Sequence, residues 1–143
     1  LVCTAIHNEV EYAVKQALSR SLTGPAALAE VISEYFLVCN RMSDHILLMY
    51  QATHFLPPKW KKQVLEAELR ITDIFIHAIR ELKNRGALPE IDEDTINLMG
   101  HNISVLGHTW TFRRWYFAKN FSIAQYIKQQ TDFVMRFLVK ENG

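Results

Sequence analysis

The sequence predicts an all-α protein, and three observations lead to this prediction. Apolar residues recur at intervals of three and four over long segments, as they do on the buried side of a helix. No segment of useful length alternates apolar and polar residues in the manner of a half-buried strand. Most of the 5 glycines and 4 prolines fall between the periodic segments, where helices end. The 143 residues are enough for a single domain, residues 1–143, around one hydrophobic core.

The periodic segments predict a bundle of about six helices. They cover roughly residues 2–20, 25–40, 43–55, 58–85, 92–118 and 122–140. Pro25 suits the first position of a helix, because the N–H that it lacks would have no partner there. Pro57 and Pro58 end the third helix. Gly86 suits the left-handed residue that follows a helix, so the fourth helix is expected to end just before it.

The last two helices have recognisable start signals. Asp92 is expected to cap the helix over 92–118. Ser122 and Gln125 have the spacing of a capping box, which predicts the start of the last helix. In the fourth helix, Leu65 and Leu69 continue the spacing of Ile76 and Ile79, and this stripe is expected to face the core.

The helix over 92–118 is apolar on two sides, whereas an ordinary surface helix has one apolar stripe. One of its two faces is therefore expected to pack on a second copy of the chain or on a ligand. The first stripe comprises Ile96, Met99, Ile103, Leu106, Gly107, Trp110 and Arg114, and the second comprises His101, Val105, His108, Phe112 and Trp115. Periodicity leaves open which stripe faces a partner and whether both pack inside one subunit.

Composition excludes several classes of protein. The net charge of +1 is far from the basic balance of a self-contained DNA-binding domain. No run of about 18 apolar residues is present, so no transmembrane helix is expected. Cys3 and Cys39 have neither metal-site nor disulfide-framework spacing, which indicates reduced thiols and a cytoplasmic location. The chain begins at Leu1 without an initiator methionine, and we expect further sequence to precede it.

Four segments give the chain a resemblance to a known family. They are the helix start at Gly24-Pro25, the helix end at Phe55-Leu56-Pro57, the segment Glu81–Leu88, and the terminal pair Gly107–Trp115 and Tyr126–Thr131. With these segments the chain resembles the C-terminal ligand-binding and dimerisation domain of tetracycline-repressor-type (TetR family) transcriptional regulators.

The resemblance implies a homodimer in which the last two helices of each subunit form a four-helix bundle. It also implies an N-terminal helix-turn-helix domain, absent from this chain, through which alone operator DNA would be bound. The first helix would connect that domain to the effector site. The expected dimer residues are Ile103, Leu106, Gly107, Trp110, Arg114, Tyr126, Gln130, Phe133 and Phe137.

A second set of residues is expected to line a pocket for a small, mostly apolar effector. These side chains are large, soft or of mixed polarity, and each of them could equally be ordinary core packing. They are Tyr35, Cys39, Met42, Met49, Tyr50, Phe75, His101, His108 and Phe112. Arg113 and Arg114 could stack on aromatic rings, pair with carboxylates, or bind an acidic group of the ligand.

The sequence predicts no metal, no cofactor and no catalytic activity. Asp73 and His77 are four residues apart and could share a metal, but no helix-bundle metal motif accompanies them. The lysines around Trp60 indicate a solvated face. No phosphate-binding loop, nucleophile elbow or triad spacing is present. An alternative from another class is a helical-bundle enzyme or carrier of apolar molecules with no link to DNA, and a helix-turn-helix pattern in the preceding sequence would argue against it.

Overall fold

The computed structural model describes residues 2–18 and 24–139, apart from the side chains of residues 2–4, 6 and 18. These residues form an all-helical bundle, which confirms the predicted fold class. Its helices are α1 (Val2–Leu18), α2 (Pro25–Arg41), α3 (Ser43–Thr53), α4 (Pro58–Asn84), α5 (Glu93–Phe112), α6 (Arg114–Asn120) and α7 (Ile123–Leu138). The predicted ends near residues 20 and 140, and the side chain of Cys3, which is predicted to be a reduced thiol, lie outside the described part of the chain.

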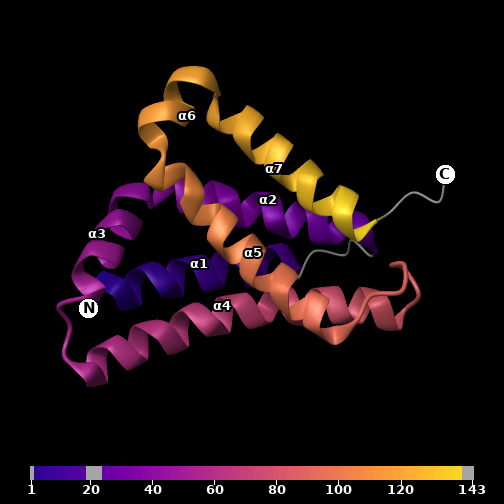
Figure 1. Cartoon of the computed structure of the whole chain (residues 1–143), viewed down its shortest axis with the longest axis horizontal. Coiled ribbons are helices and arrows are strands. Elements are labelled where there is room, and N and C mark those ends of the chain that lie inside the picture. Colours follow the sequence, from indigo (N-terminus) through magenta and orange to yellow (C-terminus); the bar gives the residue numbers. More distant parts are fainter. Residues whose placement is uncertain (1, 19–23, 140–143) are drawn as a thin grey trace.

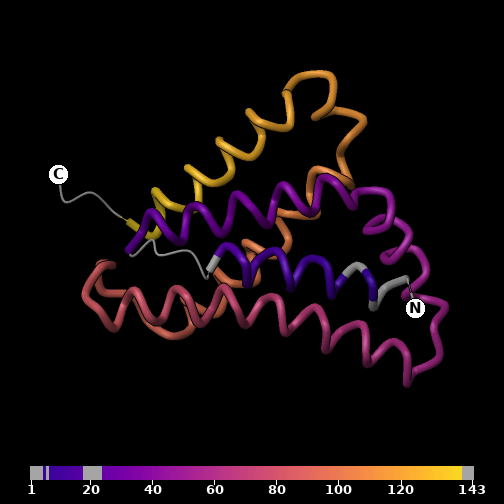
Figure 2. Tube along the Cα trace, turned by 180° about the vertical axis from the view of Figure 1, so that it is seen from behind, coloured from indigo at the N-terminus to yellow at the C-terminus, as the bar shows by residue number. Residues whose placement is uncertain are grey.

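Helices α2 and α4 form the two sides of the bundle. α1 packs against both of them on one face, and α5 crosses both on the opposite face (Figure 1, Figure 2). α3 lies at one end and contacts α1 and α5, while α7 packs along α2. α2 and α4 touch each other only slightly. α1 and α5 therefore close the space between α2 and α4 from opposite faces, and α3 closes it at one end.

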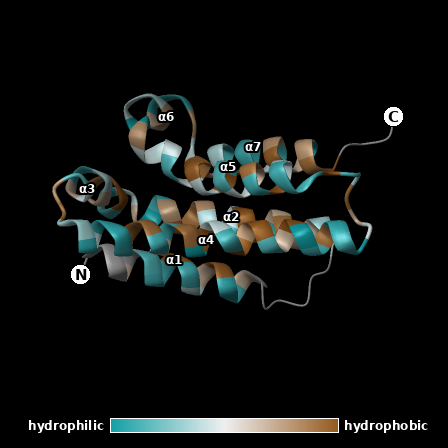
Figure 3. Ribbon diagram, turned by 60° about the horizontal axis from the view of Figure 1, so that its bottom comes forward, coloured by the Kyte–Doolittle hydropathy of each residue, from teal (hydrophilic) through white to brown (hydrophobic). Residues whose placement is uncertain are grey.

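Every described helix except α6 buries a set of apolar side chains, and Figure 3 colours the ribbon by the hydropathy of each residue. In α4 the buried side carries Val64, Ile71 and Ile79, but Leu65 and Leu69 are about half exposed, at 51% and 48%. The predicted inward position of these two leucines is wrong. The helix has apolar residues over a wide arc, and α1 and α5 cover only the part of it that contains Val64.

The predicted start and stop signals are confirmed. Gly86 follows α4 with φ 74°, a left-handed conformation that glycine adopts without a side-chain clash. The Asp92 carboxylate accepts a hydrogen bond from the Thr95 backbone N–H at 2.7 Å. Ser122 and Gln125 form both hydrogen bonds of a capping box at the start of α7.

The helix expected to run without interruption over 92–118 is broken at Arg113, which separates α5 from α6. The break has a packing cause. It allows the rings of Trp110 and Phe117 to stack with centroids 6.0 Å apart and an interplanar angle of 9°. In a straight helix residues seven apart are displaced by about 10 Å along the axis, too far for such a stack. Tyr126 of α7 contacts both rings and completes this aromatic corner.

Two glycines of α5 allow close helix packing. A Cβ atom at Gly107 would lie 2.4 Å from Cε2 of Tyr35, and one at Gly100 would lie 2.3 Å from Cγ1 of Ile76. Both distances are well below van der Waals contact, so neither position tolerates a side chain without a shift of its neighbour. α5 therefore approaches α2 at Gly107 and α4 at Gly100. No described helix is both long enough and apolar enough to cross a membrane.

Candidate functional site

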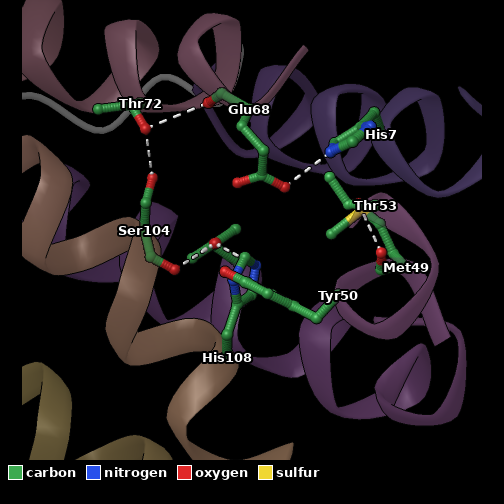
Figure 4. Close-up of polar contacts among 9 residues, drawn as sticks. His7, Met49, Tyr50, Thr53, Glu68, Thr72, Ser104 and His108 are labelled. Atoms are coloured by element: carbon green, nitrogen blue, oxygen red, sulfur yellow. Dashed lines mark hydrogen bonds and ion pairs between the residues drawn. The ribbon is translucent and has the colours of Figure 1, made fainter. Parts of the chain in front are cut away.

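A group of polar side chains lies in the centre of the bundle, where an apolar core would be expected. Figure 4 shows most of its members and the hydrogen bonds among them. We call this group the central polar cluster. It comprises His7 of α1, Tyr35 of α2, Tyr50 of α3, Glu68 and Thr72 of α4, and Ser104 and His108 of α5.

His108 connects two tyrosines from different helices. Its Nδ1 lies 2.8 Å from the Tyr50 hydroxyl and its Nε2 lies 3.3 Å from the Tyr35 hydroxyl. The Tyr35 hydroxyl donates its only proton to the Ser104 carbonyl oxygen at 2.7 Å. The Tyr35 oxygen must therefore accept from Nε2–H, and Nδ1 of the neutral ring accepts from Tyr50. The hydrogen bonds run in one direction from α3 through α5 to α2.

Thr72 and Ser104 join α4 to α5 in a similar way. The Thr72 hydroxyl donates to the Glu68 backbone carbonyl at 3.1 Å, so it can only accept from the Ser104 hydroxyl, 2.8 Å away. The hydroxyl protons of Tyr35, Thr72 and Ser104 are thus all used within the protein.

Glu68 is the charged member of the cluster. Its Oε1 lies 2.7 Å from Nε2 of His7, which is itself only 2% exposed. The second carboxylate oxygen is turned away from His7, to the side of Ser104 (Figure 4). Among the described residues, no donor is hydrogen-bonded to that oxygen. The Glu68 side chain is 25% exposed although it points into the bundle, so water can reach part of it.

The protein keeps Glu68 ionised. Burial raises the pKa of its carboxyl, but the hydrogen bond from His7 and the electrostatic effects of His108 and His7 outweigh burial and lower it below 4.5. Burial lowers the pKa of His108 below 6.5, with Glu68 opposing this effect. Near neutral pH the centre of the bundle therefore holds a carboxylate beside a neutral imidazole.

The hydroxyls and the thiol around Glu68 stay protonated. Burial, with Glu68 and Cys39 as smaller contributors, raises the pKa of Tyr50 to about 12. Burial also raises the pKa of the Cys39 thiol to about 12 and that of Tyr35 well above 10. A thiol in this state is a poor nucleophile, so Cys39 serves as a small apolar side chain.

Aromatic and sulfur-containing side chains surround the cluster. Phe75 meets Tyr35 edge to face, with centroids 5.0 Å apart, and Phe112 meets Tyr50 in the same way at 4.7 Å. Met49 is buried on the same helix as Tyr50. Phe112 and Tyr50 are partly exposed, at 40% and 37%, so this side of the cluster is open to solvent. The arrangement suits a molecule with an apolar body and one polar group.

The structure brings most of the predicted pocket residues together. Tyr35, Tyr50 and His108 belong to the central polar cluster, and Cys39, Phe75 and Phe112 lie against it. Met42 and Met49 are buried in the same core. His101 is exposed, although it is seven residues from the buried His108, because that part of α5 turns Gly100 and Ile103 toward the core.

The predicted dimer residues separate into three groups by burial. Ile103, Gly107, Trp110 and Tyr126 are buried within the chain, whereas Phe133 and Phe137 are 67% and 55% exposed. Leu106 and Gln130 are intermediate, and Arg114 is exposed and pairs with Asp44 at 2.9 Å. The stripe with Ile103 and Trp110 therefore faces the subunit core. The outward side of α5 carries Leu98 and Val105, at 60% and 54%.

His7, Glu68, Thr72 and Ser104 were not predicted as site residues. A signal for them exists in the sequence. His7 precedes Val10 and Val14 in the buried stripe of α1, and Glu68 lies between the buried Val64 and Phe75 of α4 at helical spacing. A polar residue inside an apolar stripe needs a partner, but the sequence does not show which residue on another helix supplies it.

The other features singled out in the sequence lie on the surface. Asp73 and His77 are exposed on α4, and His77 lies 3.9 Å from Glu81. The described residues contain no group of three or more potential metal ligands. Lys59 stacks on the ring of Trp60 at 5.6 Å, and Arg113 lies 5.2 Å from the ring of Trp115.

Comparison with known proteins gives one informative match. The chain is 25% identical over 109 residues to the HTH-type transcriptional regulator HbdR of Aromatoleum sp. (strain CIB). The match covers 76% of this chain and 46% of that protein, so the chain spans less than half of the regulator's length. No family profile and no solved structure matches the chain. The similarity is to a transcriptional regulator, the class of protein that the sequence predicts.

Proposed function

We propose that this chain is the effector-binding and dimerisation part of a ligand-responsive transcriptional regulator of the TetR type, acting as a repressor in the cytoplasm. The central polar cluster is the main observation behind this proposal. It is a partly accessible polar site, bordered by aromatic side chains, in a chain similar to a helix-turn-helix regulator. In this proposal the cluster binds a small molecule and catalyses no reaction.

The proposed mechanism is a shift between two settings of α1. α1 contributes His7 to the cluster and would lead to the DNA-binding domain in the complete protein. An effector that binds one setting of α1 more tightly than the other populates that setting. In a homodimer this changes the spacing of the two DNA-binding domains and therefore the affinity for operator DNA.

A DNA-binding assay with the complete protein tests this function. We expect the complete protein to bind the DNA upstream of its own gene, measured by fluorescence anisotropy, and the present chain not to bind it specifically. Small molecules that raise the melting temperature of the chain should release the complete protein from that DNA. Sequence-specific binding by the chain alone, or stabilising ligands that leave the DNA affinity unchanged, would contradict the proposal.

A further inference from the structure

The chemistry of the effector can be narrowed from the hydrogen bonds of the central polar cluster. Its hydroxyl protons are used within the protein, and Nδ1 of His108 already accepts from Tyr50. The second carboxylate oxygen of Glu68 is an acceptor with no donor among the described residues. The cluster therefore lacks a donor at this oxygen.

The Glu68–His7 pair is costly for the fold. Nδ1 of His7 is buried and has no hydrogen-bond partner among the described residues. An unsatisfied buried polar atom costs about 1–3 kcal/mol. The Glu68 carboxylate is also partly removed from water here, and this loss of hydration offsets the hydrogen bond that it accepts from His7. A pair of side chains that destabilises the fold, at a position that solvent can reach, is typical of a binding site.

The charge of the cluster restricts the head group of a ligand. The hydrogen-bonded side chains of the central polar cluster include no lysine and no arginine. A ligand carboxylate would meet the like charge of Glu68 with no lysine or arginine of the cluster to compensate it. A hydroxyl or an ammonium group, in contrast, would donate to the free oxygen, and the apolar body of the ligand would contact the partly exposed rings of Tyr50 and Phe112.

We propose that the effector has an apolar body and a hydrogen-bond-donating head group, and that this head group binds the second carboxylate oxygen of Glu68. The inference rests on the proposed effector-binding role and adds the chemical class of the ligand. The donor can be a neutral hydroxyl or a cationic ammonium group. Both would bind the same oxygen, but the affinity of the ammonium would depend more strongly on the negative charge of Glu68.

The test uses matched probes and the purified chain. Each of four bodies, phenylethyl, naphthylmethyl, cyclohexylethyl and octyl, is prepared with a hydroxyl, ammonium, carboxylate or methyl head group. Affinities are measured by calorimetry and by saturation-transfer NMR. We expect hydroxyl or ammonium probes to bind at least about tenfold more tightly than their methyl counterparts, and carboxylate probes to bind no better than methyl probes.

Two variants at Glu68 make the test specific. Glu68→Met keeps a long side chain but removes the acceptor, and it should abolish the preference for donor head groups while the methyl probes still bind. Glu68→Gln keeps a neutral acceptor, so it should remove a preference for ammonium and retain one for hydroxyl. Glu66→Gln, on the exposed side of the same helix, is the matched control and should behave as the native chain. Circular dichroism checks that each variant is folded.

The outcomes separate this inference from the proposed function. Probes that bind without regard to head group, or a preference that survives in Glu68→Met, would overturn the inference and leave an apolar effector site in place. If no probe binds the folded native chain, both the effector site and the inference fail. A donor preference that only the Glu68 variants abolish supports both.

Discussion

At the scale of single residues, Gly107 shows how tightly the site is built. A Cβ atom there would lie 2.4 Å from Cε2 of Tyr35 and 3.0 Å from Sγ of Cys39. The absence of a side chain brings α5 close enough to α2 for the Tyr35 hydroxyl to reach the Ser104 carbonyl. The sequence predicts that Gly107 contacts a second subunit, but its close neighbour in the structure is Tyr35 of the same chain.

Gly107→Ala should destabilise the chain by about 1–3 kcal/mol, since overpacking outweighs the gain of about 1 kcal/mol in helix propensity. The free energy of unfolding in urea measures this change. Asn102→Ala, at an exposed position of the same helix, is the control and should not lower stability. A stabilised Gly107→Ala variant would show that α5 and α2 are not in close contact at this point.

Stability should also fall as the pH is lowered from 7.5 to 5. The pKa of His108 is lowered in the folded chain, so below about 6.5 the unfolded chain binds a proton that the folded chain does not. The lowered pKa of Glu68 acts in the same direction below about 4.5, where the unfolded chain takes up a proton first. Urea unfolding of His108→Gln should show a shallower loss between pH 7 and 5, whereas the exposed His45→Gln should match the native chain.

Because Glu68 and His7 are hydrogen-bond partners, we expect each single substitution to lower stability more than the double substitution does. Removing one partner leaves the other without its hydrogen bond, so His7→Leu and Glu68→Met should each cost about 1–2 kcal/mol, a reduced value because Glu68 is partly exposed. The double variant should be as stable as the native chain or more stable. Additive losses in urea unfolding would mean that the two side chains act independently.

At the scale of helices, the features that depend on neighbouring residues were predicted from the sequence, and those that depend on contacts between helices were not. Caps and breaks such as Ser122 and Gly86 act within one turn, and the helix starts and ends were predicted from them. The break at Arg113 was missed, because it depends on the contact of Phe117 with Trp110 and with Tyr126 from another helix. Tyr35, Tyr50 and His108 were predicted as site residues from the chemistry of their side chains. The pairing of Glu68 with His7 was not predicted, because it joins residues 61 positions apart in the sequence.

The aromatic corner between α5 and α7 should therefore depend on Phe117. We expect Phe117→Ala to cost about 1–3 kcal/mol and to shift the fluorescence of Trp110 to longer wavelength, because its ring loses the stacked partner. Tyr116→Ala, on the exposed side of α6, should have a smaller effect on both measurements. Equal effects of the two variants would argue that the break at Arg113 has another cause.

At the scale of the whole molecule, exposed apolar side chains lie on every helix, and those of α5 and α7 belong to the helices of the proposed dimer. α5 exposes Leu98 and Val105, and α7 exposes Phe133 and Phe137. Large exposed apolar surfaces are unusual on monomers and typical of interfaces. The predicted dimer is therefore expected to use these residues, while Ile103 and Trp110 remain in the subunit core.

Light scattering at micromolar concentration should give a mass of 33.2 kDa, twice the 16.6 kDa of one chain. The double variant Val105→Glu, Phe133→Glu should give 16.6 kDa, because charged side chains at the interface would lose their hydration without a partner. Leu65→Glu, on the exposed part of α4, should keep the mass of the dimer. A monomeric native chain would remove the dimer from the proposed function.

The two glycines of α5 also restrict how the bundle can move. Gly100 fits against Ile76 of α4, and Gly107 fits against Tyr35 of α2, on two different helices. If α5 slid along its axis by one residue, a side chain would replace each glycine and collide with its neighbour. These two contacts therefore oppose a shift of α5 along its axis. A displacement that begins at Glu68 is therefore expected to be taken up by α1, which contributes His7 to the same pair.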